Sequence, residues 1–294
     1  MKRKIMGWVL TVCLLLCCSV SAAAAPRTLI PCGNTIGVKL FTQGLVVTGF
    51  ADDSAARTAG LKKGDVILEA DGETVQTAQE LRDCLAQEQV ILTVLRNGRE
   101  AEFCVMPKDR ELGAYVRDSI AGIGTVTYYD PNTGAFGALG HGVNDADTEL
   151  LVPIEAGVVV RSSVDTVRQG KKGEPGVIKG NFDVDQILGQ VTVNSDHGIF
   201  GTLSVPFPGK PIPVAEASEI IPGPASILAN VEGDKVQEYT VEIQKIYPQA
   251  NKTGRNLLLK VTDPALLHTT GGIIQGMGVS YNRDNTGTLK ACKG

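Results

Sequence analysis

Three histidines are the side chains in this sequence best suited to proton transfer near neutral pH, and their surroundings differ. His141 stands in the run Gly-Ala-Leu-Gly-His-Gly-Val, where glycines on both sides free the backbone and leave the ring approachable. His197 lies in a Ser-Asp-His-Gly turn sequence, and His268 follows two leucines. We therefore take His141 as the candidate general base and expect the other two histidines to be structural.

A metal centre is the first alternative for His141. It would take Asp145 and Asp147 as further ligands, but a zinc site needs three or four ordered ligands, and the sequence offers no such cluster. The cysteines beyond residue 25 form no C-x-x-C pair and no Cys/His group with zinc spacing. We expect no metal and no cofactor. We expect buried free thiols, with a disulfide as the alternative that export would permit, at Cys32, Cys84, Cys104 and Cys292.

Length and composition limit the class of protein. The 294 residues suggest about two domains, and 43% apolar with 20% charged residues is typical of a soluble globular protein. Lys and Arg total 28 against 32 Asp and Glu, which gives a net charge of −4. Three of the basic residues fall within the first 25, so the rest of the chain is more acidic still. This balance disfavours nucleic acid as a partner, because nucleic-acid binders normally carry a basic patch.

The first 25 residues have the pattern of an export signal. Lys2-Arg3-Lys4 is followed by an apolar run from Ile5 to Val20 and by the small residues 21–25. The apolar run is somewhat short for a membrane span of about 20 residues, so both a cleaved signal and a retained anchor remain open. We expect the protein to work outside the cytosol, soluble or anchored, and to contact the membrane only through this segment.

Residues 27–108 are predicted to form a small module of mixed structure. Two β-rich runs, 35–41 and 44–50, are predicted to pair as a hairpin. Thr77 and Glu80 have the spacing of a capping box, which predicts the start of a helix. A second hairpin is expected to close the module.

The string AARTAGLKKGDVILEADGETV within this module closely resembles the PDZ family. A PDZ domain binds an extended peptide by adding it as a strand to a sheet edge beside a helix. By this resemblance, Ile36, Gly37 and Val38 match the loop that receives the terminal carboxylate of the peptide, and Gly37 would allow a close backbone approach. The alternative is that the PDZ domain only packs against its neighbour.

Residues 109–294 are predicted to be mainly β. About ten short β-like runs, separated by Gly, Pro, Asn and Asp, occur between Ile123 and Val261, with no convincing amphipathic helix among them. This spacing predicts a barrel or a sandwich. Examples of the runs are 124–129, 150–154, 158–161, 189–193, 236–246 and 257–261.

Three features in order, the PDZ module, the sequence FGALGHGV and the stretch from Val261 to Met277, resemble the stage IV sporulation protein B family of serine endopeptidases. The resemblance implies a chymotrypsin-like double β-barrel after the PDZ domain, with His141 as the base and Asp263 as the residue that fixes its tautomer. It implies cleavage of a membrane-bound regulatory protein between the two forespore membranes, which activates a late sigma factor. It also implies that the PDZ ligand includes the protein's own chain.

The chain departs from this family where the nucleophile should stand. The serine of the family would occupy the position of Gly278, and glycine has no hydroxyl to attack a peptide bond. Ser280 lies two residues on, about 6–7 Å along an extended chain, and is a weak substitute. The polar segment 282–290 is expected to supply no strand to close the second barrel. We therefore expect the family resemblance to end near Met277, in a chain that is truncated or frameshifted there.

Two functional hypotheses follow from these features. The first is an exported serine endopeptidase of sporulation signalling, represented by a damaged product. The second is a catalytically dead, PDZ-containing protein that binds peptides. The glycine at position 278 favours the second hypothesis for the chain as written, whereas the order of the domains favours the first for its lineage.

Overall fold

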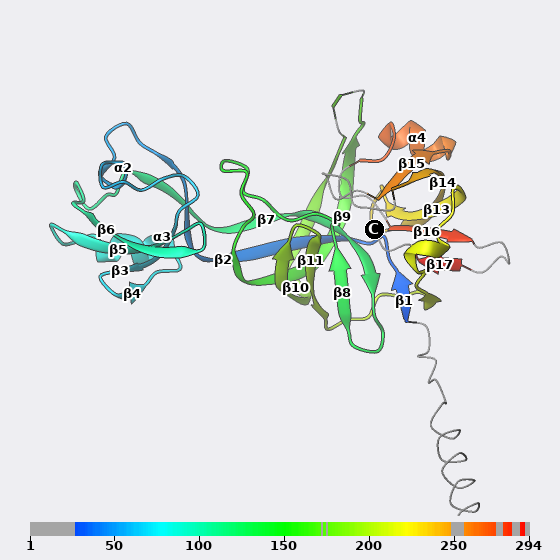
Figure 1. The fold of residues 1–294 in the computed structure, drawn as a ribbon, viewed down its shortest axis with the longest axis horizontal. Coiled ribbons are helices and arrows are strands. Elements are labelled where there is room, and N and C mark those ends of the chain that lie inside the picture. The colour runs from blue at the N-terminus through cyan, green and yellow to red at the C-terminus, as the bar shows by residue number, and fades with distance from the viewer. Residues whose placement is uncertain are drawn as a thin grey trace, which may run out of the picture.

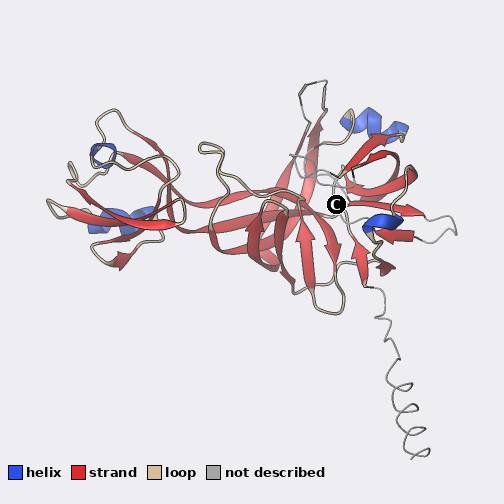
Figure 2. Ribbon diagram, in the orientation of Figure 1, coloured by secondary structure: helices blue, strands red, loops and turns tan. Residues whose placement is uncertain are grey.

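The computed structural model describes residues 27–171, 173–174, 176–247, 256–274, 279–283 and 289–291. The fold is mainly β, with 57% strand and 8% helix, and it contains an N-terminal PDZ domain and a peptidase domain, which confirms the predicted fold class (Figure 2). The predicted export segment and Cys292 lie outside the described residues. Within the described part, no helix is long and apolar enough to cross a membrane.

Two long strands, β2 (Thr35–Phe50) and β7 (Ala114–Tyr129), run side by side and connect the two halves of the molecule (Figure 1). They pair antiparallel on either side of a bulge at residues 42–45 of β2. The prediction that residues 35–50 form a hairpin is therefore wrong, because both runs belong to one strand. Gly44 has a φ of 148°, which favours glycine and lets the chain bulge out and continue instead of reversing.

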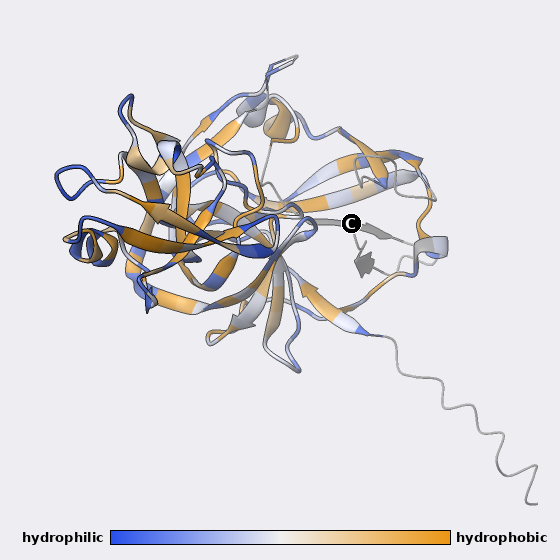
Figure 3. Ribbon diagram, turned by 60° about the vertical axis from the view of Figure 1, so that its left-hand side comes forward, coloured by the Kyte–Doolittle hydropathy of each residue, from blue (hydrophilic) through white to orange (hydrophobic). Residues whose placement is uncertain are grey.

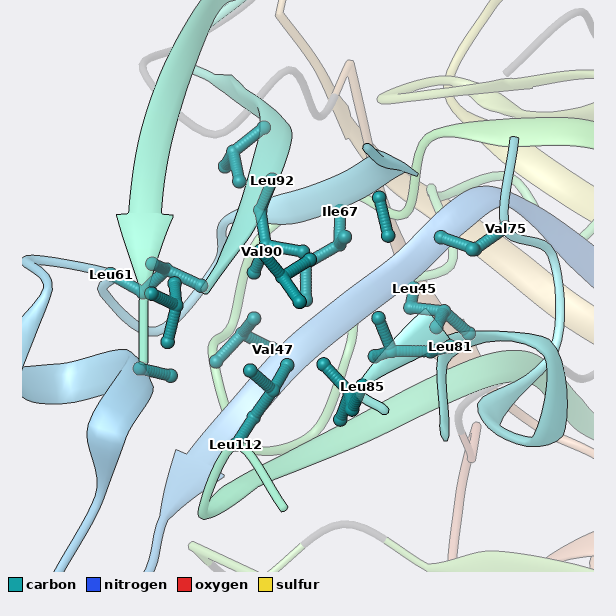
Figure 4. Packing of buried hydrophobic residues seen from close by; sticks show 14 of the residues in the cluster. Leu45, Val47, Leu61, Ile67, Val75, Leu81, Leu85, Val90, Leu92 and Leu112 are labelled. Atoms are coloured by element: carbon teal, nitrogen blue, oxygen red, sulfur yellow. The ribbon is translucent and has the colours of Figure 1, made fainter. Parts of the chain in front are cut away.

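The PDZ domain occupies the chain between these strands and uses one end of each. Its elements are α2 (Ala55–Thr58), β3 (Val66–Ala70), β4 (Glu73–Thr74), α3 (Ala78–Cys84), β5 (Val90–Arg96) and β6 (Arg99–Val105). The predicted capping box is confirmed, since the Thr77 hydroxyl accepts from the Glu80 N–H and the Glu80 carboxylate accepts from the Thr77 N–H. Buried side chains from β2, β3, β5 and α3 meet in one apolar core, to which Leu45, Ile67 and Leu81 contribute (Figure 4).

Six strands of the peptidase domain close into a barrel, because β2 pairs with β7 on one side and with β9 on the other. Apolar residues follow the barrel strands (Figure 3), and Leu40 and Phe136 inside it are no more than 1% exposed. A short strand, β1 (Thr28–Pro31), continues the ladder of β2 along β7, and β12 (Ile212–Pro213) pairs with β1. The order around the barrel is β2, β7, β8 (Ala135–Ala138), β11 (Gly198–Leu203), β10 (Val177–Ser195) and β9 (Ile154–Arg168).

The PDZ domain is thus inserted between the first two strands of the barrel. The sequence places all of residues 27–108 in the PDZ module, but β1 and the first half of β2 belong to the barrel. An alternating run such as 35–41 predicts a half-buried strand without saying which strand it pairs with. This is why the sequence misplaces the boundary.

A second, five-stranded sheet lies beside the barrel, and its own apolar core includes Tyr239, Ile243 and Leu266. The runs predicted at 236–246 and 257–261 are confirmed. Only the last residue of 150–154 is in a strand, so that prediction is largely wrong. The strands, in pairing order, are β15 (Leu257–Val261), β14 (Val236–Ile246), β13 (Gly223–Asn230), β16 (Val279–Arg283) and β17 (Leu289–Ala291), and the helices are η1 (Ala217–Glu219) and α4 (Pro264–Thr270).

The tail after position 278 differs from the prediction. It was expected to be too polar for strands, yet β16 begins at Val279, opposite Leu228 of β13, and β17 pairs with β16 in turn. The alternating sequence Val-Ser-Tyr-Asn-Arg satisfies the period of a strand even though its polar residues predominate. The expectation that the tail supplies no strands is therefore wrong.

Candidate active site

His141 lies in the loop that follows β8. The loop turns sharply because Leu139 and Gly140 both have positive φ values, 72° and 69°. The His141 Nδ1 atom is 2.9 Å from the carbonyl oxygen of Gly142. A carbonyl only accepts, so this contact assigns the hydrogen of the neutral ring to Nδ1 and leaves the lone pair on Nε2. This is the tautomer that a general base of a serine peptidase requires.

A cavity of about 610 Å³ opens beside the His141 ring. One wall is the stretch from Ile120 to Thr125 of β7, and another is the start of β10 at residues 176–178. Val38 and Leu40 of β2 contribute apolar surface to it. A space of this size is typical of ligand sites, and this one combines apolar walls with a single imidazole.

The neighbouring strand β10 holds the His141 loop in place. The Asn194 side chain accepts from the Val143 N–H at 2.9 Å and donates to the carbonyls of Val143 and Val152 at 2.9 and 3.0 Å. Gly142 packs against the backbone of Ser195 so closely that a Cβ would lie 2.8 Å from its oxygen. Glycine after His141 therefore has a packing reason in addition to the access that the sequence suggested.

Asp196 is a candidate that the sequence analysis missed. It lies in the tight turn between β10 and β11, and it lines the same cavity as His141. The turn sequence Ser-Asp-His-Gly was considered only for His197, which is exposed and does not line the cavity. The turn follows a strong β run in the sequence, which marks it as the end of a strand. The sequence does not show that this strand, β10, packs against the loop after β8, so it does not place Asp196 near His141.

Asp263 occupies a different place, at the start of α4 beside the second sheet. Its carboxylate accepts from the N–H groups of Ala265 and Leu266 at 2.9 and 3.1 Å, which makes it the N-cap of this helix. It does not line the His141 cavity, and no hydrogen bond among the described contacts joins it to the His141 ring. The structure therefore places His141 and Asp196 on the same cavity and Asp263 in a capping role; the catalytic role predicted for Asp263 stays a prediction.

The predicted nucleophile position lies outside the described residues, as do residues 275–277 before it. Ile274, the last described residue on that side, contacts Gly176 at the wall of the cavity. On the other side the chain resumes in β16, where Ser280 pairs with Ile227.

The residues predicted to hold the terminal carboxylate of a peptide are not in a loop. Ile36, Gly37 and Val38 lie in the barrel part of β2, which pairs with β7 on one edge and β9 on the other. A Cβ on Gly37 would overlap Phe182 and Val160, so glycine is needed here for strand packing. Since both edges of β2 are occupied, this segment cannot receive an added peptide strand, and the assignment is corrected.

The carboxylates considered as metal ligands have another partner. Asp145, buried, and Asp147 both form ion pairs with Arg117 of β7, at 2.5 and 2.8 Å. Within the described ranges, no group of three or more His, Cys, Asp or Glu side chains is arranged to hold a metal ion.

The described cysteines are free thiols, but only one of them is fully buried. Cys32 is buried, and burial raises the pKa of its thiol to about 12. Cys84 is partly buried and Cys104 is exposed, so the expectation of buried thiols is correct only for Cys32.

Two curated proteins are similar to parts of the chain. It is 28% identical over 167 residues to a putative zinc metalloprotease of Agrobacterium fabrum, which covers 54% of this chain and 41% of that protein. It is 34% identical over 71 residues to serine protease HTRA1 of Xenopus laevis, which covers 24% of this chain and 16% of that protein. The chain thus spans less than half the length of these relatives.

Family models match both parts of the chain. The model for a PDZ domain matches residues 46–96, which lie after the bulge of β2. The model for SpoIVB peptidase S55 matches residues 108–284, more than half of the chain, and runs past Met277, where we expected the resemblance to end. The order of these matches agrees with the closed barrel, the inserted PDZ domain and the His141 loop, and the protein belongs to the SpoIVB peptidase S55 family.

Proposed function

We propose that this protein binds an extended segment of a protein substrate in the His141 cavity, at a site built for serine-peptidase chemistry. The observation that carries the proposal is the His141 ring, whose Nδ1 is engaged by the Gly142 carbonyl at 2.9 Å while the ring lines an open cavity. With Nε2 free, the imidazole is set to take a proton from a hydroxyl presented in that cavity.

The covalent step requires a nucleophile that the chain lacks. A serine at position 278 would lose its proton to His141 Nε2 as its oxygen bonds to the scissile carbonyl carbon, and the ring would then return the proton to the leaving amine. Gly278 offers no hydroxyl, so the chain as written should bind the segment without forming an acyl-enzyme. The peptide-binding alternative is therefore the function that we propose for this chain, and serine endopeptidase activity is the function of its lineage.

Two carboxylates compete for the role of orienting the imidazolium. Asp263 is favoured by the order of motifs in the sequence, and Asp196 is favoured by its place on the same cavity wall as His141. The Asp263 Oδ1 atom already accepts from two N–H groups at the start of α4, whereas Asp196 lines the His141 cavity, so we favour Asp196.

The identity of the substrate is proposed from the family and the export pattern. The substrate that we propose is a membrane-bound regulatory protein of sporulation, located between the forespore membranes. The N-terminal export segment, the PDZ domain and the family of the chain support this proposal. Cleavage of this regulatory protein by an active member of the family would lead to activation of a late sigma factor.

A restored nucleophile tests the proposal. The full chain, Gly278→Ser and Gly278→Ser with His141→Ala would be purified in mild detergent and given an unfolded protein substrate. We expect binding by all three and cleavage only by the single variant, faster than the other two by about 10²-fold or more. Because β16 begins directly after position 278, we expect this single change to suffice. Cleavage by the unmodified chain, or by the variant without His141, would overturn the assignment.

A further inference from the structure

One edge of β7 is unpaired over most of its length. The other edge pairs with β2 from Ala114 to Thr125, and only Asp118 is left out of that ladder. At the first register shift, residues 42–45 of β2 face only Asp118 of β7, whose carbonyl accepts from the Thr42 hydroxyl at 2.9 Å; at the second shift the extra residue is Thr48 of β2. Within the described ranges, no strand pairs with the opposite edge of β7 before residue 126.

The hydrogen-bonding groups of this free edge are aimed outward at both ends. Val47 gives its N–H to Asp65 and receives the Gly64 N–H, at 2.8 and 2.9 Å, on the side away from β7. Its partner Val116 must therefore direct its own N–H and carbonyl away from β2. At the far end, the Thr125 carbonyl accepts from Leu139 at 3.1 Å, on the side away from β2, and alternation gives Ala121 the same direction. Val116 and Ala121 are five residues apart, so the alternation changes phase once between them, at a bulge at Asp118.

The two ends of the edge lie in different functional regions. In the PDZ domain, α3 packs beside β7, which is the arrangement in which a peptide is added next to a helix. In the barrel, Ile120 and residues 122–124 form a wall of the His141 cavity, and Ala121 is exposed beside them. A Cβ on Gly122 would meet nothing within 4 Å, so the backbone is open to a ligand there.

The edge is suited to a peptide backbone more than to a charged ligand. Arg117 is the only cationic residue between positions 114 and 124, and Asp145 and Asp147 already pair with it. What remains is a row of N–H and carbonyl groups, which an extended chain satisfies by strand addition.

We propose that β7 is a continuous docking edge, on which the C-terminal tail of a protein substrate adds antiparallel and reaches from the PDZ domain to the His141 cavity. Antiparallel addition puts the C-terminus of the tail at the Ala114 end of β7 and its upstream residues opposite Ile120 to Gly124. This deepens the function proposed above and rests on it, because it names the substrate segment and its direction.

The arrangement fixes a distance along the substrate. An added strand passes the bulge at Asp118 with one residue fewer than β7, so the segment at His141 lies about five to nine residues upstream of the one opposite Ala114, or about 17–31 Å at about 3.4 Å per residue. Binding of the C-terminus to the PDZ domain would thus determine which substrate residues lie at the His141 cavity. The distance of these residues from the C-terminus would matter more than their sequence.

Photo-cross-linking on the unmodified full chain tests this. The probes are peptides of about 14 residues, alternating Thr and Val with a free C-terminal carboxylate, each with one photoreactive residue at a different position. We expect probes labelled near the C-terminus to link to α3 and the start of β7, and probes labelled about five to nine residues upstream to link to Ile120–Gly124 or the His141 loop. Two residues added at the C-terminus should shift the cavity-linking position by two.

Each remaining outcome has a separate meaning. Cavity links that do not depend on distance from the C-terminus overturn the docking edge while leaving the proposed function intact. The absence of cavity links from every probe contradicts both. Links between two copies of β7, growing with protein concentration, would assign the edge to self-association and overturn the proposal.

A matched pair of variants tests the role of the backbone. Ala121→Pro removes an N–H that faces the free edge and spares the ladder to β2, whereas Ala121→Val keeps that N–H. We expect the proline variant to lose cavity links about 5- to 10-fold, which is the value of about one hydrogen bond, and to keep links at α3. Equal behaviour of the two variants, both folded by circular dichroism, would contradict strand addition at the cavity.

Discussion

The barrel and the five-stranded sheet contribute to the candidate site in different ways. In the barrel every strand has two neighbours, and the loop that carries His141 is held by Asn194 of an adjoining strand. The sheet ends in β15 and β17 and carries Asp263, which caps a helix, and the chain that leads to Gly278. The half that supplies the base is thus fully formed, whereas the half that should supply the nucleophile lacks its reactive side chain.

The contact between these regions combines backbone and side-chain groups. The Gly170 N–H, in the hairpin between β9 and β10, donates to the Thr270 carbonyl at 2.8 Å, and a Cβ on Gly271 would overlap Gly170. The Asn230 side chain of β13 donates to the Thr35 hydroxyl of β2 at 3.1 Å, and Val167 of β9 packs against the core of the sheet.

The largest expected effect distinguishes the two cores. Phe136→Ala, in the barrel, and Ile243→Ala, in the sheet, each remove a side chain that is 1% exposed and should cost about 3–5 and 2–5 kcal/mol of unfolding free energy. Only the barrel variant should lose peptide binding at the His141 cavity. Denaturant unfolding and probe cross-linking measure the two effects, and equal loss of binding would show that the regions are one unit.

A smaller effect comes from the Cys32 thiol, which reports on the barrel alone. Its pKa is raised by burial from 9.0 to about 12, so the folded state keeps the proton while the unfolded state releases it above pH 9. Stability is therefore complete below about pH 9 and declines up to about pH 12, by about 1–2 kcal/mol at pH 10. Cys32→Ala should remove this decline; an unchanged pH dependence in urea unfolding would place its cause elsewhere.

The smallest expected effect on stability separates the two aspartates. Asp263→Ala should cost about 1 kcal/mol of stability through the lost N-cap, whereas Asp196→Ala, on an exposed turn, should change stability by less than about 0.5 kcal/mol. In the Gly278→Ser background, Asp196 should be the more important of the two aspartates for catalysis. Loss of its carboxylate should lower kcat by as much as about 10⁴-fold with little change in KM. A larger fall in kcat from Asp263→Asn than from Asp196→Asn would restore the prediction made from the sequence.

Local signals in the sequence were sufficient for the elements that depend on near neighbours. The capping box at Thr77 and Glu80 joins groups three residues apart, and the runs at 236–246 and 257–261 carry their own strand period. The PDZ string and the His141 motif also identified the family. These features could be predicted because the interactions that fix them lie within a few residues.

Tertiary structure alone decided how these elements combine. The run 35–41 is compatible with a hairpin, but pairing with β7 and β9 makes it a barrel strand and inserts the PDZ domain after it. Asp196 lines the same cavity as His141 because β10 packs against the loop after β8. Asp263 caps the start of α4. A strand period states which faces are buried and leaves the partner unspecified, because partner choice depends on contacts between residues far apart in the chain.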